Sequence, residues 1–161
     1  MHKRKVVAIL KYILNLNSGW ANKHHTKMTQ PIKIVVVEDD NDLRFLYQNK
    51  LEYQGFEVFT ARDGEEGLQV IQRCEPHIIL LDLLMPRMGG AEMLARLRSE
   101  EWGSDIRVVV LTNISKDEAP PQLRFLNVDR YAVKAHHTPG QVVDIVHDVL
   151  GVKRAGDRAV T

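Results

Sequence analysis

Five short runs of aliphatic, mostly β-branched residues alternate along this chain with stretches of helical periodicity, and no other feature restricts its fold as much. The clearest run, Ile32 to Val37, is nearly continuous and stops abruptly at Glu38, as is typical of a strand covered on both faces. The other runs are 56–60, 77–81, 106–111 and 130–133. Strands that alternate with helical segments indicate a doubly wound α/β fold, in which helices cover both faces of a five-stranded parallel sheet.

Five helices are predicted between and after these strands. Asp63 is an N-cap residue for the second helix, and Thr138 followed by proline begins the last one. Pro120-Pro121 restricts the fourth helix to the residues that follow, because proline is accepted in the first turn of a helix but not inside it. The predicted helices span about 43–51, 63–75, 90–100, 120–126 and 139–150.

The distribution of charge separates an N-terminal segment from the rest of the chain. Residues 1–30 contain six basic side chains and no acidic one, so that residues 31–161 carry a net −5 within the total of +1. We interpret residues 1–30 as a basic extension, either disordered or an amphipathic helix, with membrane contact kept as an alternative. Its apolar run is shorter than the roughly 20 residues that a membrane span requires. Residues 31–151 form the predicted domain, and 152–161 form a short C-terminal tail.

Composition argues against two classes of protein. The near-neutral net charge is unlike that of a protein that binds nucleic acid through bulk charge, so we expect no direct contact with nucleic acid. Cys74 is the sole cysteine, which excludes a disulfide framework and suits the reducing environment of a cytoplasmic protein.

Polar side chains stand at the ends of four of the predicted strands. They are Glu38-Asp39-Asp40, Asp82, Thr112 and Lys134. Each of them alone has an ordinary structural explanation, because acids cap helices, threonine begins turns and lysine is usually solvated. Ligands of open parallel sheets bind at the carboxyl ends of the strands, so the coincidence of all four predicts one shared site.

With these residues the domain resembles the receiver domain of two-component response regulators. The similarity rests on the segments VEDD at 37–40, LLDLLMPRMGG at 80–90, LT at 111–112 and YAVK at 131–134, and it covers residues 32 to about 150. The resemblance implies a flavodoxin-like fold with strand order 2-1-3-4-5 and five helices.

The resemblance also implies an Mg²⁺ site. Asp82 is expected to be the phosphoacceptor and to bind Mg²⁺ together with Glu38, Asp39 and the backbone carbonyl of Leu84. The residue types agree, because clustered carboxylates repel one another and a hard cation with oxygen ligands relieves that repulsion. The role of Asp40 stays open.

Three further residues have roles that the resemblance implies. Lys134 and Thr112 are expected to contact oxygens of the phosphoryl group, as an ammonium and a hydroxyl can. Thr112 and Tyr131 are expected to form a switch that moves when Asp82 is phosphorylated, although Tyr131 also fits as an ordinary strand aromatic.

Several positions depart from the family pattern. Asn113 stands where the family prefers Ala or Gly, and we expect it to narrow access to the phosphoryl group. Ala135 replaces a proline, so we expect a trans peptide bond after Lys134 and a different placement of that side chain. Leu84 and Ile114 put apolar groups where water would enter, which predicts that the phosphoryl group is lost over times on the order of hours or longer.

We interpret the chain as a stand-alone phosphoacceptor that signals by binding partners. It is not expected to be an enzyme, beyond assisting its own phosphorylation and dephosphorylation, and no output module is expected after Leu150. The expected partners are a histidine kinase or phosphotransfer protein, recognised around residues 44–50, and an unknown downstream protein.

Two other functions stay open at this stage. A degenerate receiver would dock its partners without phosphorylation, which Asn113 and Ala135 permit. A phosphatase of the haloacid-dehalogenase type also uses an aspartate after a parallel strand, but it needs an acid two residues later, where this chain has Leu84.

Overall fold

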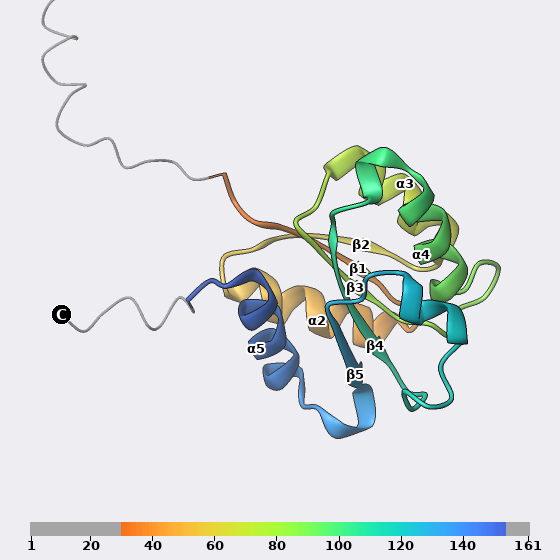
Figure 1. Ribbon diagram of the computed structural model, residues 1–161. Coiled ribbons are helices and arrows are strands. Elements are labelled where there is room, and N and C mark those ends of the chain that lie inside the picture. Colours follow the sequence, from red (N-terminus) through yellow and green to blue (C-terminus); the bar gives the residue numbers. More distant parts are fainter. Residues whose placement is uncertain (1–29, 154–161) are drawn as a thin grey trace, which may run out of the picture. The chain divides into compact units, whose positions relative to one another are not determined.

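A computed structural model of the protein describes residues 30–153. The expectations for the N-terminal extension, and for all but the first two residues of the C-terminal tail, fall outside the described residues. The described chain contains one five-stranded parallel sheet of order β2-β1-β3-β4-β5 (Figure 1), which confirms the predicted fold class and strand order. The strands are β1 (Lys33–Val37), β2 (Glu57–Ala61), β3 (Ile78–Leu81), β4 (Arg107–Thr112) and β5 (Arg130–Val133).

The α-helices cover both faces of the sheet. Within the described residues they are α2 (Asn41–Tyr53), α3 (Gly64–Cys74), α4 (Gly90–Ser99) and α5 (Pro139–Leu150). Alternate residues of a strand point to opposite faces, so Ile34 and Val36 pack with α2 and α5, whereas Val35 and Val37 pack with α3 and α4 (Figure 1). In residues 30–153, no helix has both the length and the apolar character to cross a membrane.

Side-chain caps mark the starts of α2, α3 and α5, whereas α4 begins after Gly89 without one. The carboxylate of Asp63 accepts a hydrogen bond from the backbone N–H of Glu66 at 2.9 Å, as expected for the predicted N-cap. Thr138 begins α5 in a reciprocal capping box. Asp40, whose role the sequence left open, is the N-cap of α2 and accepts from the backbone N–H groups of the second and third residues after it.

The prediction of an α-helix at about 120–126 is wrong in type, because residues Pro121–Phe125 form a short 3₁₀-helix, η2. Its final hydrogen bond joins the N–H of Leu126 to the carbonyl of Leu123, three residues earlier, at 3.2 Å. Pro120 and Pro121 have no N–H to donate, and Asn127 adopts φ of +49°, so the segment is too short for α-helical turns to propagate.

Two backbone hydrogen bonds hold the carboxyl end of β1 against those of β3 and the edge strand β2. The N–H of Asp82 donates to the carbonyl of Val37 at 3.0 Å, and the N–H of Glu38 donates to the carbonyl of Ala61 at 3.0 Å. The loops that follow β1 and β3 therefore leave the sheet together, and the side chains of those loops face a common space.

Candidate functional site

Three carboxylates meet at the carboxyl edge of the sheet. One oxygen from each of Glu38, Asp39 and Asp82 lies within 4.8 Å of the others, and these three residues are called the acidic cluster below. They line a pocket of about 220 Å³ together with Leu84 and Lys134. Glu38 and Asp82 are buried, whereas Asp39 is exposed, so the cluster is open to solvent on one side.

Lys134 is held between two members of the acidic cluster. Its Nζ lies 2.6 Å from Oε2 of Glu38 and 2.8 Å from Oδ2 of Asp82. The three side chains are 8%, 3% and 7% exposed respectively, so the ion pairs are largely shielded from water. The expected trans bond is present, since no peptide bond in residues 30–153 is cis. Lys134 nevertheless reaches Asp82, so that bond has not drawn it away from the site.

The close contacts change the acidity of the buried groups. Burial raises the pKa of Glu38 above its ordinary value, and the hydrogen bond from Lys134 offsets this only in part. Burial favours the neutral form of Lys134, but its hydrogen bonds to Asp82 and Glu38 outweigh that effect and raise the pKa of the ammonium. Lys134 is therefore charged at neutral pH.

Asp82 is also contacted from the β3–α4 loop, residues 82–89. The backbone N–H of Leu84 donates to Oδ1 of Asp82 at 3.2 Å, while Lys134 takes Oδ2. Gly90 packs so closely beneath this loop that a Cβ there would lie 2.0 Å from the carbonyl oxygen of Asp82. The Leu84 side chain is 57% exposed at the rim of the pocket, and Asn113 also lines it.

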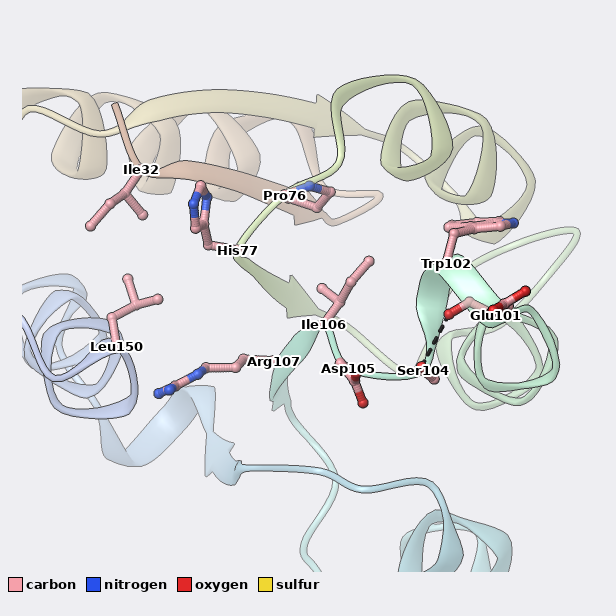
Figure 2. Close-up of a pocket in the computed structure, with 10 residues that line it drawn as sticks. All are labelled: Ile32, Pro76, His77, Glu101, Trp102, Ser104, Asp105, Ile106, Arg107 and Leu150. Atoms are coloured by element: carbon pink, nitrogen blue, oxygen red, sulfur yellow. Dashed lines mark hydrogen bonds between the residues drawn. The ribbon is translucent and has the colours of Figure 1, made fainter. Parts of the chain in front are cut away.

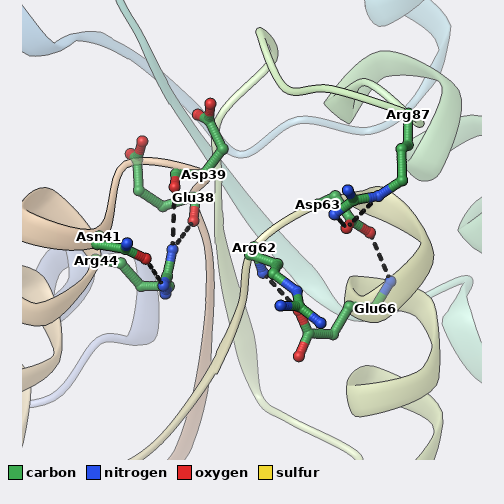
Figure 3. Close-up of polar contacts among 8 residues, drawn as sticks. All are labelled: Glu38, Asp39, Asn41, Arg44, Arg62, Asp63, Glu66 and Arg87. Carbon is green, nitrogen blue, oxygen red and sulfur yellow. Dashed lines mark hydrogen bonds and ion pairs between the residues drawn. The ribbon is translucent and has the colours of Figure 1, made fainter.

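Arg44 supports the backbone beneath the acidic cluster. Its guanidinium donates to the carbonyl of Glu38 at 2.7 Å and to the carbonyl of Asp39 at 3.3 Å, and it also bonds the side chain of Asn41 (Figure 3). The two carboxylates point away from Arg44 in the same view. From the sequence, Arg44 was expected only to lie in the stretch that recognises the phosphoryl donor. An arginine in the first turn of a helix that follows an acidic strand end could have suggested its contact with the backbone of that strand end.

A second pair of charged side chains fixes the far end of the β3–α4 loop. Arg87 donates from Nε to Oδ2 of Asp63 at 2.9 Å and bonds the same oxygen through Nη2 (Figure 3). Burial opposes ionisation of Asp63, but its hydrogen bonds from the backbone of Glu66 and from Arg87 outweigh that and lower the pKa of the carboxyl. The capping role of Asp63 is predictable from sequence, whereas no pattern around Arg87 indicates a role for it.

Neither hydroxyl of the two predicted switch residues, Thr112 and Tyr131, forms a hydrogen bond with the acidic cluster. Thr112 is the last residue of β4 and is fully buried, and its Oγ1 has no hydrogen-bond partner among the described residues. The hydroxyl of Tyr131 donates to the carbonyls of Ile114 at 2.9 Å and Ser115 at 3.3 Å. Burial raises the pKa of Tyr131. Its hydroxyl is thus bound to the loop that follows Thr112.

Larger hollows lie elsewhere on the described part of the protein: one of about 380 Å³, lined mainly by residues of α3 and α4, and two others. One of these two, of about 480 Å³, is lined by residues next to the amino ends of β1, β3 and β4, at the edge opposite the acidic cluster (Figure 2). Its polar side chains, among them His77 and Arg107, are spread apart, and the hydrogen bond drawn there joins Ser104 to the backbone of Glu101. The other, of about 730 Å³, lies beside η2 and β5. The charged side chains that line these larger hollows are all exposed, whereas the smaller pocket contains two buried carboxylates in contact with Lys134. Chemistry rather than size therefore identifies the candidate site.

Comparison with known proteins matches this geometry to one family. The family model described as "Response regulator receiver domain" matches residues 34–146. The chain is 34% identical over 105 residues to a "Probable transcriptional regulator ycf27" of Porphyridium aerugineum, covering 65% of this chain and 42% of that protein. It is 39% identical over 82 residues to "Response regulator MprA" of Mycolicibacterium vanbaalenii, covering 51% of this chain and 35% of that protein. The chain thus spans half or less of the length of these curated relatives.

Solved structures agree with the fold. The chemotaxis response regulator CheY4 of Vibrio cholerae is 25% identical with a TM-score of 0.69, and the match covers 74% of this chain and 99% of that one. The N-terminal domain of an uncharacterized protein of Wolinella succinogenes is 31% identical with a TM-score of 0.67, covering 74% and 94%. Both similarities cover nearly the whole of the compared chain.

Proposed function

We propose that this chain, which belongs to the response regulator receiver domain family, accepts a phosphoryl group on Asp82 from a phosphohistidine and thereby changes a surface that binds another protein. One observation carries the proposal above all others: the buried contact of Lys134 with Glu38 and Asp82, next to the exposed Asp39. Together these residues form a site that can hold a cation and receive an anion.

The donor set fits Mg²⁺. Three carboxylates with oxygens within 4.8 Å of one another supply the hard ligands that this ion prefers, and the exposed side of the cluster leaves room for the water molecules that it retains. We assign Glu38, Asp39, Asp82 and the backbone carbonyl of Leu84 as the groups that hold it. When bound, Mg²⁺ supplies positive charge that lowers the repulsion between an attacking carboxylate and a phosphoryl group.

The chain's own residues perform the remaining tasks of the transfer. A carboxylate oxygen of Asp82 forms the new O–P bond as the N–P bond of the phosphohistidine breaks, and the imidazole of the donor leaves as the nucleophile arrives. Lys134, already 2.8 Å from Asp82, supplies a fixed ammonium for a phosphoryl oxygen. Thr112 has a hydroxyl without a partner among the described residues, and this hydroxyl can donate to another phosphoryl oxygen.

The conformational response follows from the same contacts. When Thr112 turns toward a phosphorylated Asp82, the loop behind it shifts, and the carbonyls of Ile114 and Ser115 that hold Tyr131 shift with it. Tyr131 then changes the surface beside η2 and β5. In this proposal the protein is cytoplasmic, its donor is a histidine kinase or phosphotransfer protein, and its phosphorylated form is read by a downstream protein. It acts as a phosphoacceptor and not as an enzyme on other substrates.

Acetyl phosphate and Mg²⁺ provide a direct test, read by intact-protein mass. We expect the wild-type chain to gain the mass of one phosphoryl group, and Asp82→Asn to gain none. Asp40→Asn is the matched control. Asp40 lies two residues after Glu38 and caps α2, and asparagine is an equally good N-cap. The wild type forming no adduct would support the degenerate receiver, and hydrolysis of phosphate esters in place of a stable adduct would support the phosphatase.

A further inference from the structure

Asp63 and Arg87 join the β3–α4 loop to the start of α3, although neither belongs to the acidic cluster. Asp63 is 3% exposed and ends the β2–α3 turn, and Arg87 lies 24 residues later and five residues beyond Asp82. The side chain of Asp63 makes two kinds of contact at once. Oδ1 caps α3 through the N–H of Glu66, and Oδ2 accepts from two nitrogens of Arg87.

The part of the loop that this pair controls is the part that carries a proposed ligand. Leu83 and Met88 are buried and anchor the two ends of the loop, whereas Leu84 and Arg87, between them, are exposed. Met85, also in this stretch, is only partly buried against the core, so the ionic contact of Arg87 adds a second attachment to a stretch that burial holds only in part. Leu84, within that stretch, donates its N–H to Asp82 and presents the carbonyl assigned above to Mg²⁺.

The backbone of Arg87 is itself in an unfavourable conformation. Its φ is +63°, in the left-handed region that residues with a Cβ rarely occupy. A side chain that brings such strain is retained only where its contacts compensate for it. Next to it, the N–H of Gly64 donates to the carbonyl of Met88 at 3.0 Å, and a Cβ on Gly64 would lie 2.7 Å from that oxygen. The loop therefore turns tightly against the first residue of α3.

We propose that Asp63 and Arg87 are positioning residues, which hold residues 84–87 so that the Leu84 carbonyl and Asp82 face the same cation. This inference rests on the proposed function for the identity of the cation, but its effect on the loop does not depend on any ligand. The start of α3 thereby becomes part of the support of the phosphoacceptor site. Outer groups that orient metal ligands commonly change metal affinity by about 10-fold or more when they are removed.

Asp63→Ser is the central variant, because serine is an equally good N-cap but is too short to reach Arg87, and the loop sequence is unchanged. Arg87→Gly is the second variant, since glycine adopts the left-handed conformation freely and the fold is spared the strain. Arg96→Gln is the matched control. It weakens the exposed Arg96–Glu92 pair, which joins two residues of α4 to each other.

Two measurements test the role. The first is hydrogen exchange of residues 84–87 without metal, which we expect to be faster in Asp63→Ser and unchanged in Arg96→Gln. The second is the Kd for Mg²⁺ by titration calorimetry at a temperature where every variant is folded, which we expect to rise about 10-fold in both Asp63→Ser and Arg87→Gly. Thermal unfolding is recorded in parallel, because a purely structural pair would lower Tm and leave the Kd of the folded protein unchanged.

The inference and the proposed function fail in different ways. If the wild type binds Mg²⁺ and both variants bind it within twofold of the wild type, the positioning role is overturned and the proposed function stands. If the wild type binds no Mg²⁺ and forms no adduct on Asp82, the proposed function fails. Hydrogen exchange of residues 84–87 alone then tests whether Asp63 and Arg87 hold the loop. Faster exchange in Asp63→Ser then still supports control of the loop by α3, and unchanged exchange overturns it.

Discussion

Replacing Lys134 with methionine removes the ammonium that contacts both Glu38 and Asp82 while keeping a stem of similar length. At 2.6 and 2.8 Å, Coulomb's law gives roughly 6 kcal/mol for each contact at an effective dielectric constant of about 20, before desolvation is subtracted. Breaking a buried ion pair from one side costs about 3–5 kcal/mol, because the remaining charge stays buried without its partner. We expect a loss of this size in the free energy of unfolding, since Glu38 and Asp82 then repel each other at the sheet edge.

Urea denaturation in metal-free buffer measures this loss, and the same titration with Mg²⁺ provides an internal check. Mg²⁺ at 100 times its Kd stabilises the folded state by about 2.7 kcal/mol. In Lys134→Met the cation no longer competes with an ammonium for the carboxylates, so the stabilisation by a given Mg²⁺ concentration should be larger than in the wild type. Lys116→Met, at an exposed lysine in the β4–β5 connection, is the control and should change little.

The reasoning is refuted by either of two results. One is a decrease of less than about 1 kcal/mol in the free energy of unfolding in metal-free buffer, which is the range of a surface ion pair. It would mean that the contacts of Lys134 stabilise the fold no more than exposed ion pairs do. The other is an equal stabilisation by Mg²⁺ in the two proteins, which would mean that Lys134 and the cation do not share the same carboxylates.

Three other predictions concern the same edge of the sheet. The pKa of Asp63 is held below its ordinary 3.8, because hydrogen bonds from the α3 backbone and from Arg87 outweigh the effect of burial. The contribution of ionised Asp63 to stability is therefore present above pH 3.8 and is lost as the pH falls through the folded-state pKa. Midpoints of urea denaturation should fall less steeply with decreasing pH in Asp63→Asn than in the wild type. Gly90→Ala places a Cβ 2.0 Å from the carbonyl oxygen of Asp82, so we expect it to lower the free energy of unfolding by about 1–3 kcal/mol and to weaken Mg²⁺ binding measured by calorimetry. Gly140→Ala is the control, because the nearest atom to its Cβ is 3.9 Å away, and it should show neither effect. The phosphoryl group on Asp82 should persist for times on the order of hours, as measured by intact mass after removal of acetyl phosphate. Leu84→Asn should shorten that lifetime by admitting water, and equal lifetimes of the two proteins would exclude a role for the Leu84 side chain.

The features that could be predicted from sequence are those that depend on period and strand ends. Val35 and Val37 face one layer and Ile34 and Val36 the other, as expected of strands buried on both faces. Because parallel strands end at a common edge, the convergence of Glu38, Asp39 and Asp82 could also be expected.

Other features depend on contacts between residues that no local pattern connects. Arg87 reaches Asp63 across 24 residues, and nothing in the run that contains Arg87 indicates a partner in the β2–α3 turn. The 3₁₀ geometry of η2 reflects the two prolines at its start together with the positive φ of Asn127 just after its end, a combination that periodicity does not reveal. Asp40 could have been identified as a cap, but its position beside two metal-ligand candidates made both functions equally compatible with the sequence.

If Asp82 is phosphorylated as proposed, the buried hydroxyl of Thr112 has a thermodynamic consequence for the balance between the unphosphorylated, or resting, conformation and the phosphorylated one. A buried polar group that lacks a partner destabilises the conformation that contains it by about 1–3 kcal/mol. That penalty belongs to the resting conformation and disappears where the hydroxyl finds an acceptor. A difference of this size displaces a two-state equilibrium by roughly 5- to 150-fold. In the proposed switch, an acceptor that Thr112 gains on phosphorylation of Asp82 therefore favours the phosphorylated conformation by a free energy of this size.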